Sequence, residues 1–203
     1  ALMLTMAGGT IMHGAVGGAF FEQLWFVEER GYERAEIAKM TGWLMMTAGV
    51  LGAMLGGIGG DWVTARTGLG RPIILAGLIL LAAPFLLALR LSPGGSIWIS
   101  VGLFFGLLQF CAFPGPTFAT VQELVPPQVR STIVAATILM FNIVGLGIGI
   151  TFTGIAIDAM VAAGWNQPYS VAMIGSTIIS FLAIPCYLFA GIYYKREMAS
   201  GGT

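Results

Sequence analysis

The sequence predicts an all-α membrane protein in which six helices cross the bilayer. Of its 203 residues, 57% are hydrophobic and 9% are charged, whereas soluble domains carry about 25% charged residues. The apolar residues are gathered in six runs, each long enough for the roughly 20 residues that a spanning helix needs. The runs cover residues 1–27, 38–60, 72–91, 97–125, 128–158 and 169–194.

The connections between these runs are short, and several residues suit the helix starts. Pro72 and Pro127 fit a first helical turn, where a missing N–H is not needed, and Ser96 fits an N-cap position. Six spans place both ends of the chain on one side. That side carries five of the nine Lys and Arg residues, so the positive-inside rule favours cytoplasmic ends by a margin of one.

Glycines recur at the spacing that lets two helix backbones approach closely. Gly52, Gly56 and Gly60 follow each other every fourth residue in the second run. Three other runs contain the same spacing, in the pairs Gly14–Gly18, Gly102–Gly106 and Gly145–Gly149. Small residues four apart are typical of helix contacts in membranes. We therefore expect these faces to pack inside the bundle.

Two similar hexapeptides suggest an internal repeat. "GGIGGD" ends the second run at Asp61, and "TGIAID" ends the fifth run at Asp158. Because these runs cross in opposite directions, the two motifs fall on opposite sides of the membrane. That arrangement is expected of a 3+3 inverted repeat, which many secondary transporters contain. Chance similarity over six residues is the alternative.

Several functional classes lack support in the residues. Cys111, Cys186 and His13 are too few and too far apart for a zinc site. The chain has no G-x-S-G nucleophile motif and no Walker A motif. The zero net charge gives no basic footprint for nucleic acid. We therefore expect neither an enzyme nor a metal, cofactor or nucleic-acid binding protein.

The sequence resembles the major facilitator superfamily in several stretches. Gly57-x-x-x-Asp61, followed by Arg66 and Gly70-Arg71, resembles the loop signature of that superfamily. "PGPTFATVQELVPPQVRSTIVA" and "FNIVGLGIGITFTGIAID" are similar to the spinster-like branch, and "LWFVEERGYERAEIAKMTGW" resembles the connection between the seventh and eighth helices. The signature departs from its usual form at Trp62 and Pro72, where basic residues are expected.

This resemblance implies that the chain is the C-terminal half of a twelve-helix transporter whose N-terminal half is absent. It further implies alternating access, possible proton coupling, and an amphipathic substrate such as a lysophospholipid or sphingoid lipid. Alternatives are a sugar or organic-anion transporter, or a self-associating six-helix channel or scaffold. The expected partners are the substrate, membrane lipids and the missing half. The expected location is the plasma membrane or the bacterial inner membrane.

Charged residues at the predicted cytoplasmic end form a candidate gating loop. Asp61 lies at the end of the glycine-striped helix, within reach of Arg66 and Arg71. Glu123 and Arg130 flank the Pro126-Pro127 pair and could form a second latch. A charged latch of this kind would stabilise one conformational state of a transporter over another. The alternative is ordinary solvated loop charge.

Polar and aromatic residues inside the runs are candidates for substrate binding or coupling. Glu22 continues the Gly14–Gly18 ridge, and ionisable residues in membrane helices are often functional. It could instead reach the nearby interface, and we expect His13 to be a packed, neutral side chain. Gln109 and Asn142 lie near the middle of their helices, as substrate contacts or as interhelical hydrogen bonds. The aromatic candidates for a cavity lining, or for packing, are Phe21, Trp25, Phe110 and Phe113.

Overall fold

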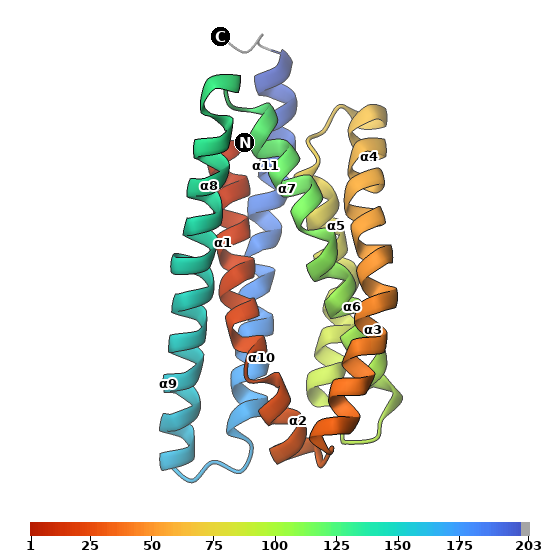
Figure 1. Cartoon of the computed structure of the whole chain (residues 1–203), viewed down its shortest axis with the longest axis vertical. Coiled ribbons are helices and arrows are strands. Elements are labelled where there is room, and N and C mark those ends of the chain that lie inside the picture. The colour runs from red at the N-terminus through yellow and green to blue at the C-terminus, as the bar shows by residue number, and fades with distance from the viewer. Residues whose placement is uncertain (200–203) are drawn as a thin grey trace.

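The computed structural model describes residues 1–199 and is built of helices that run along one long axis (Figure 1). The first half of this part contains α1 (Leu2–Ala19), α2 (Glu22–Arg30), α3 (Arg34–Met54), η1 (Leu55–Gly59), α4 (Gly60–Thr67) and α5 (Pro72–Leu91). The second half contains α6 (Ile97–Ala112), α7 (Pro114–Glu123), η2 (Pro127–Val129), α8 (Arg130–Met140), η3 (Phe141–Gly147), α9 (Ile148–Ala162), α10 (Pro168–Phe181) and α11 (Ala183–Ala199).

Five continuous helical stretches in the described part are long and apolar enough to cross a membrane. They are Arg34–Thr67, Pro72–Leu91, Ile97–Glu123, Pro127–Ala162 and Pro168–Glu197. Such a series of apolar helices makes the chain a multi-pass integral membrane protein. The start of α1 and the end of α11 lie at the same end of the bundle (Figure 1). We call this the terminal end, and the other the opposite end.

The first predicted helix differs from the expectation, because residues 1–27 do not form one continuous span. α1 stops at Ala19, and a turn at Phe20 and Phe21 leads into the short α2. The N–H groups of these phenylalanines bond three residues back, to the carbonyls of Gly17 and Gly18, at 3.4 and 3.0 Å. The preceding glycines weaken the helix there, so the chain tightens and turns rather than continuing.

Two long helical stretches each contain one π-helical segment. η1 lies between α3 and α4, and η3 lies between α8 and α9. Such segments inside α-helices are rare and frequently occur at functional sites. The stretch Ile97–Glu123 also bends at Phe113, between α6 and α7, because Pro114 and Pro116 lack N–H groups that would continue the helical hydrogen bonds.

Capping residues fix where several helices begin and end. Ser96 accepts a hydrogen bond from the Trp98 N–H at 3.3 Å, which confirms its prediction as an N-cap. Gly31 and Gly68 end α2 and α4 with positive φ angles of 73° and 67°, a conformation that glycine adopts without steric cost. These ends set the short α2–α3 and α4–α5 connections.

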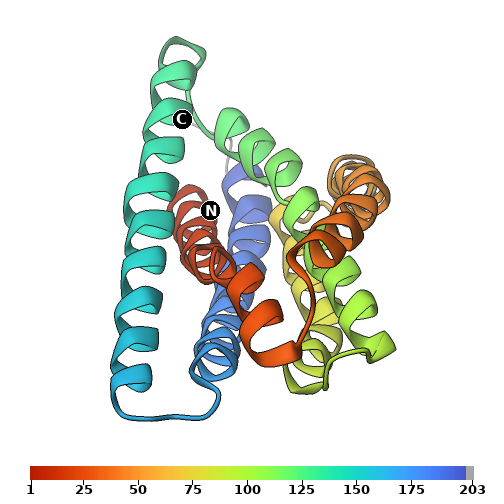
Figure 2. The same ribbon diagram turned by 60° about the horizontal axis from the view of Figure 1, so that its bottom comes forward.

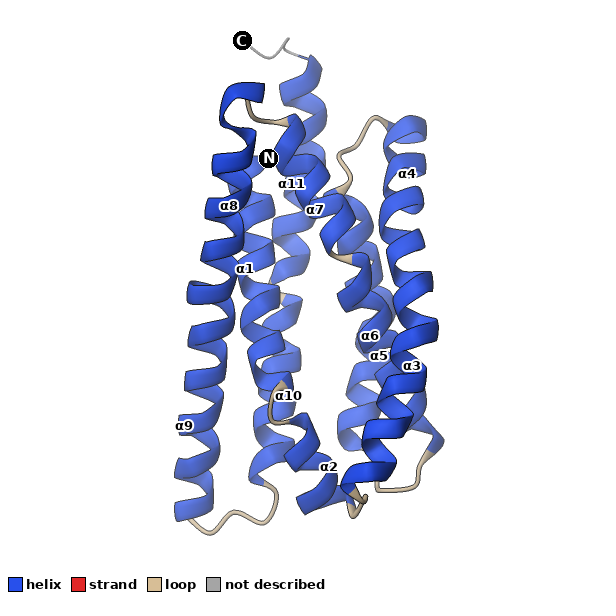
Figure 3. Cartoon of the chain, viewed as in Figure 1, coloured by secondary structure: helices blue, strands red, loops and turns tan. Residues whose placement is uncertain are grey.

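The helices form two groups that share a core. Seen with the opposite end forward, α1, α8–α9 and α10–α11 lie on one side, and α3–α4, α5 and α6 lie on the other (Figure 2). Colouring by secondary structure shows that only short loops join successive helices (Figure 3). Buried Phe141 and Tyr187 belong to the central cluster, which also contains Leu75 and Ile79 of α5. This cluster therefore connects the two groups.

The glycine stripes pack as predicted. A Cβ on Gly52 would collide with the backbone carbonyl of Leu108, and one on Gly56 with that of Ala112. Gly149 likewise leaves no room for a side chain against the backbone of Gly14. The α3–α6 and α1–α9 contacts therefore depend on missing side chains, as expected for small-residue interfaces in membranes.

Candidate functional site

A three-residue charge network lies at the terminal end of the bundle. Arg71 Nε donates to Asp61 Oδ1 of α4 at 2.6 Å, and its Nη1 lies 2.5 Å from Glu123 Oε2 of α7. Burial lowers the pKa of Arg71, but hydrogen bonds to Asp61 and Glu123 outweigh it and raise the pKa above its ordinary value. Tyr194 of α11 donates a further hydrogen bond to Glu123 at 2.8 Å. The Arg71 guanidinium, at the start of α5, thus links α5 to α4 and α7.

The other two predicted latch residues lie near this network but make different contacts. The Arg66 guanidinium stacks on Trp62 at 4.3 Å from the ring centroid. Arg130 Nε donates to the Val125 carbonyl at 3.4 Å, within its own loop. The predicted Asp61–Arg71 pair is therefore present. The predicted latch between Glu123 and Arg130 is wrong, because Glu123 pairs with Arg71 instead.

Replacing Arg71 should destabilise the protein modestly. The Asp61 side chain is 65% exposed and that of Glu123 is 38% exposed, so solvent screens both ion pairs. We expect Arg71→Met to lower the free energy of unfolding by about 1 kcal/mol, measured by thermal melting in detergent. Arg71→Lys should recover part of the lost stability. A lysine provides the positive charge but not two nitrogens placed to bond both carboxylates. A loss from Asp61→Asn larger than that from Arg71→Met would contradict the assignment of Arg71 as the hub.

A second network, near the opposite end, is built around Glu22. Arg90, at the end of α5, donates from Nη1 to Glu22 Oε1 at 2.6 Å. The Arg90 side chain is only 8% exposed and that of Glu22 is 21% exposed. The Arg90 guanidinium also lies 5.1 Å from the Trp25 ring centroid. Glu22 is therefore held as one half of a mostly buried ion pair and does not extend freely to the interface.

The start of α10 is bound into the same region by residues that the sequence analysis did not select. Glu29 accepts hydrogen bonds from the backbone N–H groups of Tyr169 and Ser170, at 2.7 and 2.9 Å. Arg30 Nη2 donates to the Arg90 carbonyl at 2.9 Å and to Ser170 Oγ at 3.0 Å. A carboxylate at a helix start is favourable because it pairs with unbonded N–H groups. These contacts are not evident from the sequence, because the charged stretch "EERGYER" resembles a solvent-exposed loop.

A cavity of about 390 Å³ lies among α1, α3, the α6–α7 break and η3. Its wall contains Phe110, Phe113 and Asn142, three of the residues predicted from sequence, together with His13. The His13 ring stacks on Phe141 at a centroid distance of 4.7 Å and meets Phe113 edge-on at 5.1 Å. Its Nδ1 bonds to the Gly9 carbonyl at 2.9 Å. We call this aromatic-lined space the face cavity.

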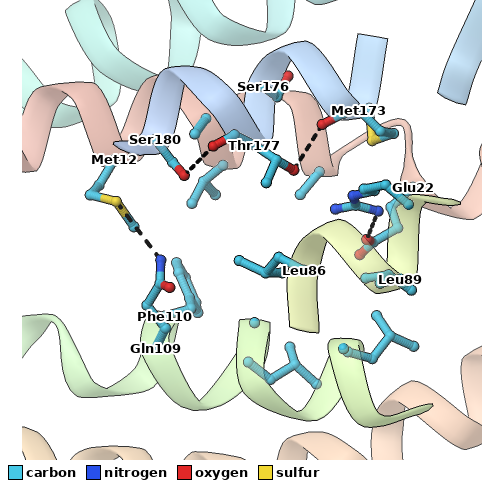
Figure 4. A pocket seen from close by; sticks show the side chains of 18 residues that line it. Met12, Glu22, Leu86, Leu89, Gln109, Phe110, Met173, Ser176, Thr177 and Ser180 are labelled. Carbon is cyan, nitrogen blue, oxygen red and sulfur yellow. Dashed lines mark hydrogen bonds and ion pairs between the residues drawn. The ribbon is translucent and has the colours of Figure 1, made fainter. Parts of the chain in front are cut away.

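A second cavity, of about 240 Å³, lies between α1, α5, α6 and α10. Glu22 borders one end of it, while Gln109 and Met12 border the other (Figure 4). Gln109 Nε2 donates to Met12 Sδ at 3.9 Å. We call this space the internal cavity, because it lies between four helices of the same chain.

The predicted binding residues are therefore divided between different places. Glu22 and Gln109 share the internal cavity, whereas Asn142 and Phe113 line the face cavity, and Phe110 borders both. Trp25 borders neither cavity: its side chain is fully buried, and Nε1 donates to Ser170 Oγ at 2.9 Å. Within the described residues, no group of three or more His, Cys, Asp or Glu could hold a metal ion.

Comparison with known proteins identifies the fold. Neither a protein-family model nor a curated protein matches the sequence. A crystal structure of a bacterial homologue of the human lysosomal transporter Spinster, inward-facing and occupied, matches 93% of this chain with a TM-score of 0.75 at 16% identity. Another, inward-facing and unoccupied, matches 98% with a TM-score of 0.66 at 17% identity. This chain covers 48% and 47% of those chains. It therefore has the fold of about half of these bacterial Spinster homologues.

Proposed function

We propose that this chain forms the C-terminal half of a secondary active transporter of the spinster-like branch. The observation that carries the proposal is the shared fold over 93% of this chain and about half of the transporter. In the proposed assembly an N-terminal half covers the face cavity. Rocking of the halves then exposes that cavity to each side of the membrane in turn. The Arg71 network would hold the terminal ends together in one of these states.

Two finer features of the architecture also belong to this proposal. The α1–α2 segment would act as a sixth, broken span, with the terminal end in the cytoplasm. A 3+3 inverted repeat is supported by the π segments η1 and η3, each in the second helix of its proposed three-helix unit. The first helix of each unit is broken, at Phe20 and at Phe113. Broken helices at matching places are typical of transporter repeats.

We propose an amphipathic lipid, such as a lysophospholipid or sphingoid lipid, as the substrate. The support is the lining of the face cavity, where aromatic rings dominate and the neutral polar groups are few. Of its lining residues only His13 is ionisable apart from Cys111. A sugar would require many more hydrogen-bonding groups, and an organic anion would require a cationic side chain.

Uptake into proteoliposomes tests this function. The complete protein is reconstituted, a pH gradient is imposed, and radiolabelled lysophosphatidylcholine, sphingosine and glucose are compared. We expect gradient-dependent accumulation of a lipid and none of glucose, and we expect Glu22→Gln to remove the dependence on the gradient. Uptake of glucose alone would contradict the substrate class. Ion conductance without accumulation would support the alternative of a self-associating channel and overturn the transporter.

A further inference from the structure

The internal cavity contains buried polar atoms that have no partner. Gln109 is 7% exposed, and its Oε1 accepts no hydrogen bond from any described residue. Arg90 is also 7% exposed, and its Nε has no described partner. Buried polar groups in native proteins are nearly always hydrogen-bonded, so each exception requires an explanation. Both residues line the same cavity, so a group bound there is a candidate partner for these two atoms once their side chains adjust, because neither atom has accessible surface in the structure.

Other polar groups in the wall of the internal cavity also favour a ligand that donates hydrogen bonds. The Thr177 hydroxyl uses its hydrogen on the Met173 carbonyl at 2.9 Å, and the Ser180 hydroxyl uses its hydrogen on the Thr177 carbonyl at 2.6 Å. Their oxygens, like Gln109 Oε1, are left as acceptors. Arg90 Nε is a donor. The wall therefore suits hydroxyl groups, which donate and accept at the same time.

The charges and the shape of the internal cavity further narrow the class of ligand that it can bind. Glu22 and Arg90 already neutralise each other, so an additional charge buried beside them would have no counter-ion and would be costly. The remaining wall is apolar, with contributions from Val16, Leu86 and Leu107. Along α6 the lining runs from Gly102 to Phe110, a length of roughly 12 Å by helical rise. The volume of about 240 Å³ is below the roughly 300 Å³ at which drug-sized sites begin.

We propose that the internal cavity is a binding site for a slender, uncharged, hydroxyl-bearing amphiphile, such as a medium-chain alcohol or diol. One hydroxyl lies at the Glu22–Arg90 end, where it accepts from Arg90 Nε and donates to the carboxylate. The alkyl chain lies along the leucine side chains of α5 and α6. A second hydroxyl, where the ligand has one, donates to Gln109 Oε1. This site lies within a single helical bundle and does not depend on transport through the face cavity.

Photolabelling tests this site with eight-carbon probes that differ only in their polar groups. The protein in lipid nanodiscs is labelled with a diazirine-bearing octanol, and labelled residues are located by mass spectrometry. We expect labels on the α1, α6 and α10 residues that line the internal cavity. Unlabelled 1,8-octanediol and 1-octanol should compete, whereas octanoate and octylammonium should not. Equal competition by the charged probes, or labels confined to the face cavity and the lipid-facing surface, would overturn the proposal.

Two variants and a matched control strengthen the test. Gln109→Leu keeps the approximate volume but removes the acceptor, and should weaken competition by 1,8-octanediol about fivefold, the usual worth of one neutral hydrogen bond. Competition by 1-octanol should change less. Val16→Phe fills the cavity and should abolish its labelling, while Asn142→Leu, in the face cavity, should leave that labelling intact. An unchanged diol affinity in Gln109→Leu would contradict the assigned contact even if Val16→Phe fails to fold.

Discussion

Arg90→Met is expected to lower the free energy of unfolding by about 3 kcal/mol, because it leaves a carboxylate without its partner inside the bundle. Glu22 Oε1 accepts from Arg90 at 2.6 Å, and the arginine side chain is only 8% exposed. Methionine fills much of the same space, so the loss is one of charge compensation more than of packing. The change also removes the guanidinium stacked against Trp25. Reversible unfolding in mixed micelles, followed by circular dichroism, measures the effect.

The double variant Glu22→Gln/Arg90→Met is the control for this interpretation. Removing both charges leaves no isolated buried ion, and replacement of a buried ion pair by neutral residues is often close to neutral. We therefore expect the double variant to be more stable than Arg90→Met alone. A double variant that is no more stable than the single would show that the pair is not coupled in the protein.

Gly56→Ala should be the second most damaging of the single changes, costing about 2 kcal/mol, in the range measured for overpacked sites. The added Cβ would overlap the Ala112 carbonyl oxygen and approach the Ala112 carbonyl carbon to 2.9 Å. These are backbone atoms of α6, so they cannot turn aside as a flexible side chain would. η1 and α6 would have to separate along their contact.

Gly57→Ala is a matched control in the same π segment. A Cβ at Gly57 meets no described atom within 4 Å, and alanine favours helix over glycine by roughly 1 kcal/mol. We expect this variant to be as stable as the parent protein or more so. Thermal melting of both variants in the same detergent gives the comparison. Equal losses at Gly56 and Gly57 would show that the helix is sensitive to any substitution and that close packing is not the cause.

Much of the fold could be predicted from the sequence because its signals are local. The length of the apolar runs predicts the spans, and the glycine spacing predicts the faces that pack at Gly52 and Gly56. Pro114 marks the break between α6 and α7, since it lacks an N–H. The turn at Phe20 and Phe21 has no proline, and it depends on how the weakened glycine segment packs against α9 and α10. The glycines alone therefore do not reveal it, since other glycine pairs, such as Gly8 and Gly9, lie within continuous helix.

The site was less predictable, because it depends on residues far apart in the chain. Asp61 and Arg71 are ten residues apart and belong to one loop signature, so their pairing could be expected. Arg90 and Glu22 are separated by 68 residues, and only the folded bundle brings them together. Glu29 and Ser170, separated by 141 residues, raise the same difficulty. An arginine at the end of an apolar run was the one available signal for Arg90, and it reads equally well as a loop charge.

Alternating access requires the face cavity to open to each side of the membrane in turn, and Asn142 offers the most direct measurement. Asn142 is exposed and lines this cavity. In the complete protein with Cys111 and Cys186 replaced by serine, Asn142→Cys is treated with a membrane-impermeant thiol reagent in right-side-out and inside-out vesicles. Alternating access predicts that the cysteine reacts from either side. Conditions that open the cavity to one side should protect the cysteine from reagent added on the other side. Reaction from neither side, or from both sides together with ion conductance, would contradict alternating access.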